Sequence, residues 1–241
     1  MTHRSAAIQT ALNLEALNQQ FANAHPKSIL LWSLETVPEG LIQSTAFGPS
    51  GMVILDLLYR DLDPRPPVPI LFLDTLHHFP ETLALVHRTQ RDYRLHLEVY
   101  RPQGLTTREA FAQRYGDDLW EKDVDYFHQL TKVAPLQLAL QELGVKSWIT
   151  GRRRDQSISR QQLPIFEWDD QGRLKINPLA HWTHREVWKY IMENKVPYNH
   201  LHDQGYGSIG DEPLTTPLQE GEHEREGRWR GTAKTECGIH R

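Results

Sequence analysis

Short apolar runs alternate with amphipathic stretches along most of this chain, and this alternation restricts the fold more than any other feature. The run PVPILFLDT, residues 67–75, is apolar almost throughout and rich in proline at its start, as expected of a strand buried on both faces. A helical pattern with a proline near its first turn follows over residues 80–93. Strands that alternate with helices predict parallel pairing and a doubly wound, mostly parallel α/β sheet.

Other segments fit the same alternation. Further strands are expected at GLIQS, LHLEVYRP and KSWITG, which are residues 40–44, 95–102 and 146–151. Further helices are expected over residues 7–24, 27–35, 51–62, 106–143 with a break near Pro135, and 183–195. Thr183 and Glu186 have the spacing of a capping box, which predicts where the last of these helices begins.

The regular pattern ends at about residue 196, and a charged, glycine-rich stretch follows. A tail of this length without periodicity is typical either of disorder or of a functional lid. The sequence therefore predicts an α/β domain over residues 1–195 and a loop-rich C-terminal extension, a mobile arm, over residues 196–241.

Charge and hydropathy exclude some classes of function. The chain has 241 residues and a formal net charge of −4, which disfavours wholesale nucleic-acid binding. No apolar run approaches the roughly 18 residues of a membrane helix. The N-terminus is polar and has no compact apolar signal region, so a cytoplasmic location is expected. Positive charge gathers locally, in GRRRDQSISR (151–160) and EREGRWR (224–230), and such clusters suit a small polyanion.

Three polar loops follow predicted strands, at residues 44–51, 73–82 and 151–157. Loops at the carboxyl ends of parallel strands converge on one crevice. The first loop, STAFGPSG, offers hydroxyl groups and the start of a helix, which together suit phosphate, although an ordinary turn has the same composition. It is not a Walker loop, because no Gly-Lys-Ser/Thr follows.

The other two loops carry titratable groups. Asp74, His77 and His78 in the second loop could bind ribose, a metal or a proton, or could serve structure alone. The third loop places three arginines in succession, which either bind an anion such as phosphate or sulfate or form a solvated basic loop.

Cys237 is the only cysteine, and four residues follow it in the sequence, in the stretch KTECGIHR. One cysteine excludes an intramolecular disulfide and an intrachain four-cysteine iron–sulfur cluster. The residue is either a chance surface thiol or a reactive thiol on an arm that also carries Arg225 and Arg228. Any redox cycle at Cys237 must use a thiol from another molecule.

Taken together, these stretches resemble the adenylylsulfate and phosphoadenylylsulfate (PAPS) reductases. The resemblance extends over roughly residues 40–241, and its terminal motif is the most specific part. It implies an adenine nucleotide α-hydrolase-like fold, a homodimer, and reduction of activated sulfate to sulfite in sulfate assimilation and cysteine biosynthesis. The matching motifs are LDTLHHFPET, KVAPLQLAL, GRRRDQS, DQGYGSIG and ECGIH.

This family has two branches, and the sequence resembles the branch without a cluster. Where the cluster-bearing branch has one pair of cysteines, this chain has Phe127 and His128. Where that branch has its second pair, this chain has Asp211 and Leu214. The resemblance therefore implies no iron–sulfur cluster and PAPS as substrate, with a cluster-free adenylylsulfate reductase as the alternative.

The resemblance also implies a mechanism and a partner. The Cys237 thiolate would attack the sulfur of PAPS, release adenosine 3′,5′-bisphosphate and leave an S-sulfocysteine. An external dithiol, thioredoxin or glutaredoxin in this family, would then release sulfite. The dependence on an external thiol agrees with the separate argument from the cysteine count.

Roles carry over from the family motifs to individual residues. Cys237 is implied as the nucleophile, and His240 either tunes that thiol or binds phosphate. The implied contacts with substrate are phosphate for Ser44, Thr45, Gly48, Ser50, Arg153 and Arg154, adenosine for Leu73 and Thr75, phosphosulfate for Lys132, and sulfate for Arg225 and Arg228.

Two rival functions stay open at this point: an ATP-using adenylyltransferase relative and a non-catalytic nucleotide sensor. The first loop has Ala46-Phe47 and lacks the aspartate of the related ATP-hydrolysing pattern Ser-Gly-Gly-x-Asp. This departure argues against ATP cleavage and against a metal at that loop.

Overall fold

The structure is a computed structural model that describes residues 12–232, 234 and 236–240. Its centre is a six-stranded sheet with the order β3-β2-β1-β4-β6-β5. Five of the strands run parallel, and β5 pairs antiparallel with β6. The strands are β1 (Leu41–Ser44), β2 (Ile70–Leu73), β3 (Leu97–Tyr100), β4 (Ser147–Ile149), β5 (Phe166–Trp168) and β6 (Leu174–Ile176).

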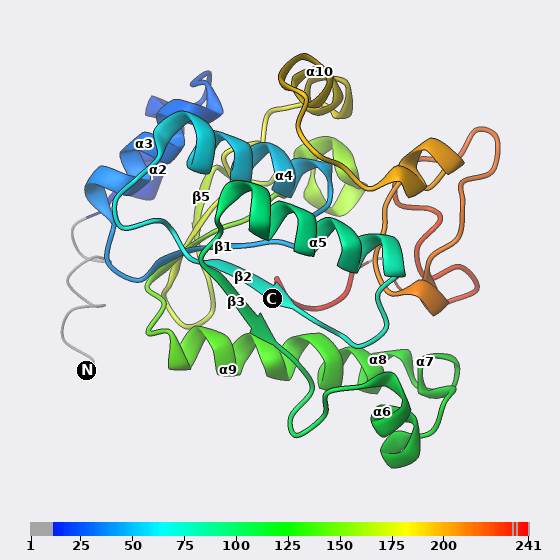
Figure 1. Cartoon of the computed structure of the whole chain (residues 1–241). Helices are drawn as coiled ribbons and strands as arrows, with labels where there is room; N and C mark the ends of the chain where they lie inside the picture. Colours follow the sequence, from blue (N-terminus) through cyan, green and yellow to red (C-terminus); the bar gives the residue numbers. More distant parts are fainter. Residues whose placement is uncertain (1–11, 233, 235, 241) are drawn as a thin grey trace.

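Helices cover both faces of this sheet (Figure 1). One face carries α3 (Pro26–Thr36), α4 (Pro49–Asp56), α5 (Pro80–Tyr93) and α10 (His184–Asn194), with α2 (Leu14–Gln20) beside β5. The other face carries α9 (Ala134–Glu142), which α6 (Arg108–Tyr115), α7 (Leu119–Lys122) and α8 (Val124–His128) precede in the chain. The predicted doubly wound, mostly parallel α/β fold is confirmed.

The strands alternate their side chains between two apolar cores, as the two-residue period of a strand requires. Ile70 and Phe72 point into the core beneath α3, α4 and α5, whereas Leu71 points into the core beneath α9. Trp148 and Ile149 divide in the same way between the two cores. Because helices bury both faces of the sheet, its central strands are apolar at nearly every position.

The expected strands at residues 40–44, 67–75, 95–102 and 146–151 are confirmed as β1 to β4, but β5 and β6 were not predicted. Each of these two strands has only three residues, and a polar turn joins them. Three residues are too few to show the alternation of apolar and polar side chains that identifies a strand in a sequence. Their pairing comes from the tertiary structure, in which β6 extends the sheet from β4.

The predicted helix break near Pro135 is wrong. A π-helical segment, Gln129–Val133, leads into α9, and the linking residues Val133 and Ala134 keep right-handed helical dihedral angles. A proline has no N–H for the ordinary helical bond. The wider π turn before it accommodates that loss while the helix direction continues.

The other helix predictions are confirmed within the described residues. Thr183 and Glu186 form the predicted capping box: Glu186 Oε2 accepts from the Thr183 N–H at 2.7 Å, and Thr183 Oγ1 accepts from the Glu186 N–H at 3.3 Å. Of the helix expected over residues 7–24, the part up to residue 11 lies outside the described residues, and α2 covers Leu14–Gln20.

The C-terminal extension crosses the edge of the sheet where the parallel strands end (Figure 1). Its regular structure within the described residues consists of short 3-10 turns, such as His200–Gln204 and Glu212–Leu214. It is therefore loop-rich, as predicted, while its separate domain status and mobility stay predictions. No described helix combines the length and the apolar character that a membrane span requires.

Candidate active site

The order of the strands reverses between β1 and β4, and the candidate site lies at this point. Strands β2 and β3 follow on one side of the pair, and β6 and β5 follow on the other. In open α/β sheets, ligands bind outside the carboxyl ends of the strands at such a switch point. The loops after Ser44 and Ile149 therefore face each other across the expected crevice.

A pocket of ≈ 200 Å³ occupies this crevice, and the C-terminal extension forms its far wall. Seven of its lining residues come from the end of β1, the loop after it and the start of α4, and the others come from the segment after β4 and from the extension. The polar and aromatic lining side chains, with the residues around the thiol, are Ser44, Thr45, Gly48, Ser50, Arg152, Arg160, Ser208, Glu224, Arg225, Arg228, Trp229, Cys237, Ile239 and His240.

Close backbone packing builds the side of the pocket that the loop after β1 forms. A Cβ atom at Gly51 would lie 2.1 Å from Thr45 Oγ1, and one at Gly151 would lie 3.0 Å from the Gly51 nitrogen. Gly48 caps α4 without a side-chain hydrogen bond. The N–H groups at the start of α4 thus lie beside the pocket without a side-chain cap, which is an arrangement that suits phosphate.

Arg153 joins the two loops to the extension. Its guanidinium is buried and donates to Ser50 Oγ at 2.6 Å, to Asp155 Oδ1 at 2.9 Å and to Glu224 Oε2 at 2.5 Å. Three bonds to three different segments hold the position of this side chain. Arg153 thus contacts the loop after β1 through Ser50 but does not line the pocket itself, and its contact with phosphate stays a prediction.

Arg160 and Arg225 both bind the carboxylate of Glu236. Arg160 forms two bonds, at 2.8 Å and 2.7 Å, and Arg225 donates at 3.2 Å. Burial raises the pKa of Glu236, but the hydrogen bond from Arg160 and the charges of the two arginines outweigh burial and hold the pKa below its ordinary value. Burial lowers the pKa of Arg225 to about 10, so the guanidinium stays charged at neutral pH.

Arg228 lies over the indole ring of Trp229, with its Cζ atom 4.5 Å from the ring centroid. Its Nη1 atom donates a long hydrogen bond, 3.5 Å, to Ser208 Oγ. Burial lowers its pKa. Gly210 allows this placement, because a Cβ there would lie 2.0 Å from Nη2 of Arg228.

Cys237 is half-buried and lines the pocket, but His240 does not form a hydrogen bond with it in the described part of the chain. The imidazole of His240 stacks on Trp148. Burial, and then the charges of Arg152 and Arg160, hold the pKa of His240 well below its ordinary value. A neutral imidazole supplies no cation to activate the thiol.

Several predicted site residues do not line the pocket. Arg154 bonds the Leu163 carbonyl at 2.7 Å, and Lys132 pairs with the buried carboxylate of Asp211. Leu73 and Thr75 lie at the end of β2, away from the pocket lining. The structure thus gathers Ser44, Thr45, Gly48, Ser50, Arg225, Arg228, Cys237 and His240 in one pocket, and leaves Leu73, Thr75, Lys132, Arg153 and Arg154 outside its lining.

Sequence reasoning gave no role to Arg160, Glu224 or Glu236, which the structure places in ion pairs at or beside the pocket. Arg160 ends the basic run after β4, so its charge was visible in the sequence. Its pairing with Glu236, 76 positions later, was not visible, because no local pattern encodes a contact at that separation.

Each histidine of the pair after β2 bonds a nearby backbone carbonyl. A ring nitrogen of His77 bonds the Thr75 carbonyl at 2.8 Å, and one of His78 bonds the Leu73 carbonyl at 2.9 Å. Burial lowers the pKa of both imidazoles. Among residues 12–232, 234 and 236–240, no group of three or more His, Cys, Asp or Glu side chains is placed to hold a metal ion.

Comparison with known proteins gives the same assignment over most of the chain. The family model described as "Phosphoadenosine phosphosulfate reductase domain" matches residues 40–217. The phosphoadenosine phosphosulfate reductase of Emericella nidulans is 50% identical over 97% of this chain and 76% of its own length. The adenosine 5′-phosphosulfate reductase of Salinibacter ruber is 44% identical over 98% of this chain and 92% of its own length.

Solved structures show the same similarity. A crystal structure of PAPS reductase from Candida auris, in a phosphate complex, is 44% identical with a TM-score of 0.77, over 84% of this chain and 96% of that one. FMN adenylyltransferase of Candida glabrata is 19% identical with a TM-score of 0.61, over 93% of this chain and 79% of that one. The second likeness shows a shared fold alone.

Proposed function

This chain belongs to the phosphoadenosine phosphosulfate reductase family, and from that premise we propose that it reduces PAPS through a covalent intermediate on Cys237. The observation that carries the proposal is the pocket itself. It joins the start of α4, a set of arginines and the single cysteine of the chain. An anion-binding wall and a thiol in one pocket are what attack on a bound phosphosulfate needs.

The first step breaks the bond between sulfur and the bridging oxygen. The Cys237 thiolate attacks the sulfur atom, and the electron pair of the broken S–O bond leaves with adenosine 3′,5′-bisphosphate. Cys237 then carries an S-sulfonate group. The start of α4 and the pocket arginines support this step, because they would hold the phosphates while the leaving group accumulates negative charge.

The second step needs a dithiol from outside the chain, which we propose is thioredoxin or glutaredoxin. One of its thiolates attacks the sulfur of Cys237 and expels sulfite, leaving a mixed disulfide. The second thiol of the same dithiol then attacks the first thiol's sulfur in the mixed disulfide and displaces the Cys237 thiolate. The dithiol is oxidised to a disulfide, and the sulfonate leaves as sulfite. One cysteine in the chain supports this division, because the chain has no thiol that could resolve the intermediate.

We propose PAPS as the preferred nucleotide and keep adenylylsulfate as the alternative, since relatives of similar identity carry both names. The arginines around the pocket favour the nucleotide with the additional phosphate. The test is sulfite release from each nucleotide with thioredoxin as reductant. A higher kcat/KM with adenylylsulfate would reverse this assignment. The proposed homodimer is tested separately by light scattering.

Cys237→Ser tests the central role of the thiol. We expect this variant to bind adenosine 3′,5′-bisphosphate as the original protein does and to release no sulfite. Both rival functions predict another result: an adenylyltransferase would keep its magnesium-dependent turnover of ATP, and a nucleotide sensor would show no turnover before or after the change. Undiminished sulfite release would overturn the proposal.

The intermediate has its own measurement. Intact-mass spectrometry after addition of PAPS without reductant should show one sulfonate adduct, which thioredoxin then removes. Because Cys237 is the only cysteine, no other thiol can carry this adduct. A protein that turns over and yet never shows the adduct would exclude the covalent route.

A further inference from the structure

A second cavity, of ≈ 140 Å³, lies beneath α9, and Ile239 lines both this cavity and the pocket that contains Cys237. The side chain of Ile239 therefore stands between the two spaces. One wall of the second cavity is apolar, and the other is the polar turn between β5 and β6. The apolar wall consists of Val133, Leu136, Leu140 and Trp148.

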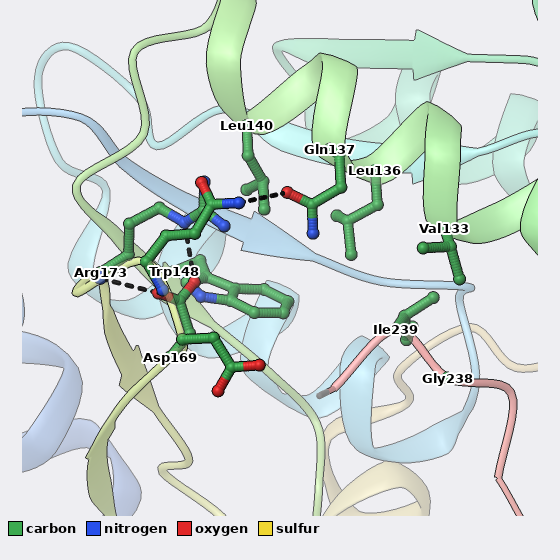
Figure 2. Close-up of a pocket in the computed structure, with 11 residues that line it drawn as sticks. Val133, Leu136, Gln137, Leu140, Trp148, Asp169, Arg173, Gly238 and Ile239 are labelled. Carbon is green, nitrogen blue, oxygen red and sulfur yellow. Dashed lines mark hydrogen bonds and ion pairs between the residues drawn. The ribbon is translucent and has the colours of Figure 1, made fainter.

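Ile239 reaches the apolar wall but does not fill the cavity. Figure 2 shows it facing Val133 and Leu136 beside the ring of Trp148. It is half-buried and packs against the apolar core beneath α9. Removal of apolar surface from water favours this contact. The open space beside it means that Ile239 gains fewer contacts there than in a close-packed core.

Gly238 connects the thiol to this contact. Its φ of 88° lies in the left-handed region, which glycine adopts without strain. A Cβ atom at Gly238 would lie 3.7 Å from Val133 Cγ2, so the position has space for a methyl group and is restricted by its backbone conformation alone. The turn at Gly238 thus sets the direction of the chain between Cys237 and Ile239.

We infer that Ile239 is a positioning residue: its packing beneath α9 holds Cys237 in the pocket, and the cavity beside it keeps that packing weak enough for the thiol to leave. This inference rests on the proposed function. The first step needs the thiol beside the bound nucleotide, and the second needs the same sulfur to meet an external thiol. The two steps therefore place opposite demands on the packing of Ile239.

Alkylation of Cys237 tests the packing without nucleotide or reductant. Iodoacetamide is neutral, and the single cysteine makes its reaction rate a direct measure of thiol exposure. We expect Ile239→Ala to react about tenfold faster than the original protein, because the apolar contact is lost. Ile239→Phe extends into the cavity and should react about threefold more slowly.

Gly238→Ala tests the same connection through the backbone. The added methyl group has space, but the left-handed conformation becomes strained, so this variant should also react faster than the original protein. Circular dichroism and urea titration of each variant show whether the rest of the chain keeps its fold.

Leu138→Ala is the matched control. It removes the same number of carbon atoms as Ile239→Ala from a 39% exposed position on α9. The alkylation rate should not change, because Leu138 does not line the cavity. Equal rates in Ile239→Ala and the original protein would overturn the inference, and so would an equal acceleration in Leu138→Ala.

Single-turnover measurements by intact mass separate the two steps. With PAPS and no reductant, Ile239→Ala should form the sulfonate adduct about tenfold more slowly, because the thiol spends less time beside the nucleotide. Thioredoxin should remove the adduct from this variant at least as fast as from the original protein. From Ile239→Phe it should remove the adduct about threefold more slowly, since the filled cavity holds the sulfur in the pocket.

Slower removal of the adduct from Ile239→Ala would refute the opposite demands of the two steps. The alkylation rates do not depend on sulfite release. If the original protein formed no adduct, the proposed function would fail, while the alkylation rates would still decide whether Ile239 positions the thiol.

Discussion

The imidazole of His240 stacks on the indole of Trp148, with ring centroids 5.5 Å apart and 20° between the ring planes. Lys175 adds a bond from Nζ to the His240 carbonyl at 3.3 Å. His240 therefore anchors the end of the C-terminal extension by stacking its ring on Trp148. The contact explains how a residue so near the end of the sequence has a fixed place.

The first prediction follows from this stacking. His240→Phe should keep turnover within about twofold of the original, because a phenyl ring stacks equally well, whereas His240→Ala loses roughly 1 kcal/mol of contact and should lower kcat several-fold. The measurement is sulfite release at saturating PAPS. Equal losses in both variants would assign a chemical role to the imidazole nitrogens.

The second prediction concerns Gly210. A Cβ at this position would lie 2.0–2.7 Å from three atoms of the Arg228 guanidinium, so Gly210→Ala must displace that side chain. We expect KM for PAPS to rise about tenfold, because Arg228 lines the pocket, with little change in the free energy of unfolding. In an Arg228→Ala background, Gly210→Ala should cause no further rise in KM for PAPS. A separate loss in that background would show that Gly210 acts on something other than Arg228.

The third prediction concerns the buried pair of Lys132 and Asp211. Asp211 is fully buried; burial raises its pKa, but the charge of Lys132 and the bond to His128 outweigh burial and hold the pKa well below its ordinary value. Asp211→Asn leaves the lysine without its counter-charge and should lower the free energy of unfolding by about 3–5 kcal/mol in urea titrations. Lys132→Met added to Asp211→Asn should recover part of that loss. No recovery would mean that packing, rather than charge, explains the cost.

The fourth prediction concerns acid. Burial lowers the pKa of His128 to about 4, and Trp229 donates its N–H to the imidazole at 3.3 Å. At pH values between this pKa and the ordinary pKa of 6.5, His128 is protonated in the unfolded chain and neutral in the folded chain. The contribution of His128 to stability is therefore complete above pH 6.5 and is lost as the pH falls toward 4.

The expected size of this loss is roughly 2 kcal/mol between about pH 7 and about pH 5. Urea titrations at both values measure it. His128→Gln should reduce the dependence on pH over this interval, since its amide does not titrate, although the variant loses stability at both values. An unchanged dependence in His128→Gln would show that other histidines account for the acid sensitivity.

The sequence was sufficient for those parts of the fold in which local chemistry and global structure agree. The strand Ile70–Leu73 is apolar at every position because helices cover both faces of the sheet. Thr183 and Glu186 cap α10 by contacts between residues only three positions apart, and a local pattern of this kind can be recognised from the sequence alone. The strands β5 and β6 were missed because three residues show no periodicity, and their partner strand lies elsewhere in the chain.

The candidate site divides in the same way. The single cysteine, the basic runs and the polar loops after strands were visible in the sequence, and a count of one cysteine implies that any redox cycle at Cys237 uses a thiol from another molecule. Which of these groups meet depended on the reversal of strand order between β1 and β4 and on the path of the extension across that edge. The pairing of Arg160 with Glu236 spans 76 positions, and ion pairs at such separations are decided by packing, because charge alone does not select one partner among many.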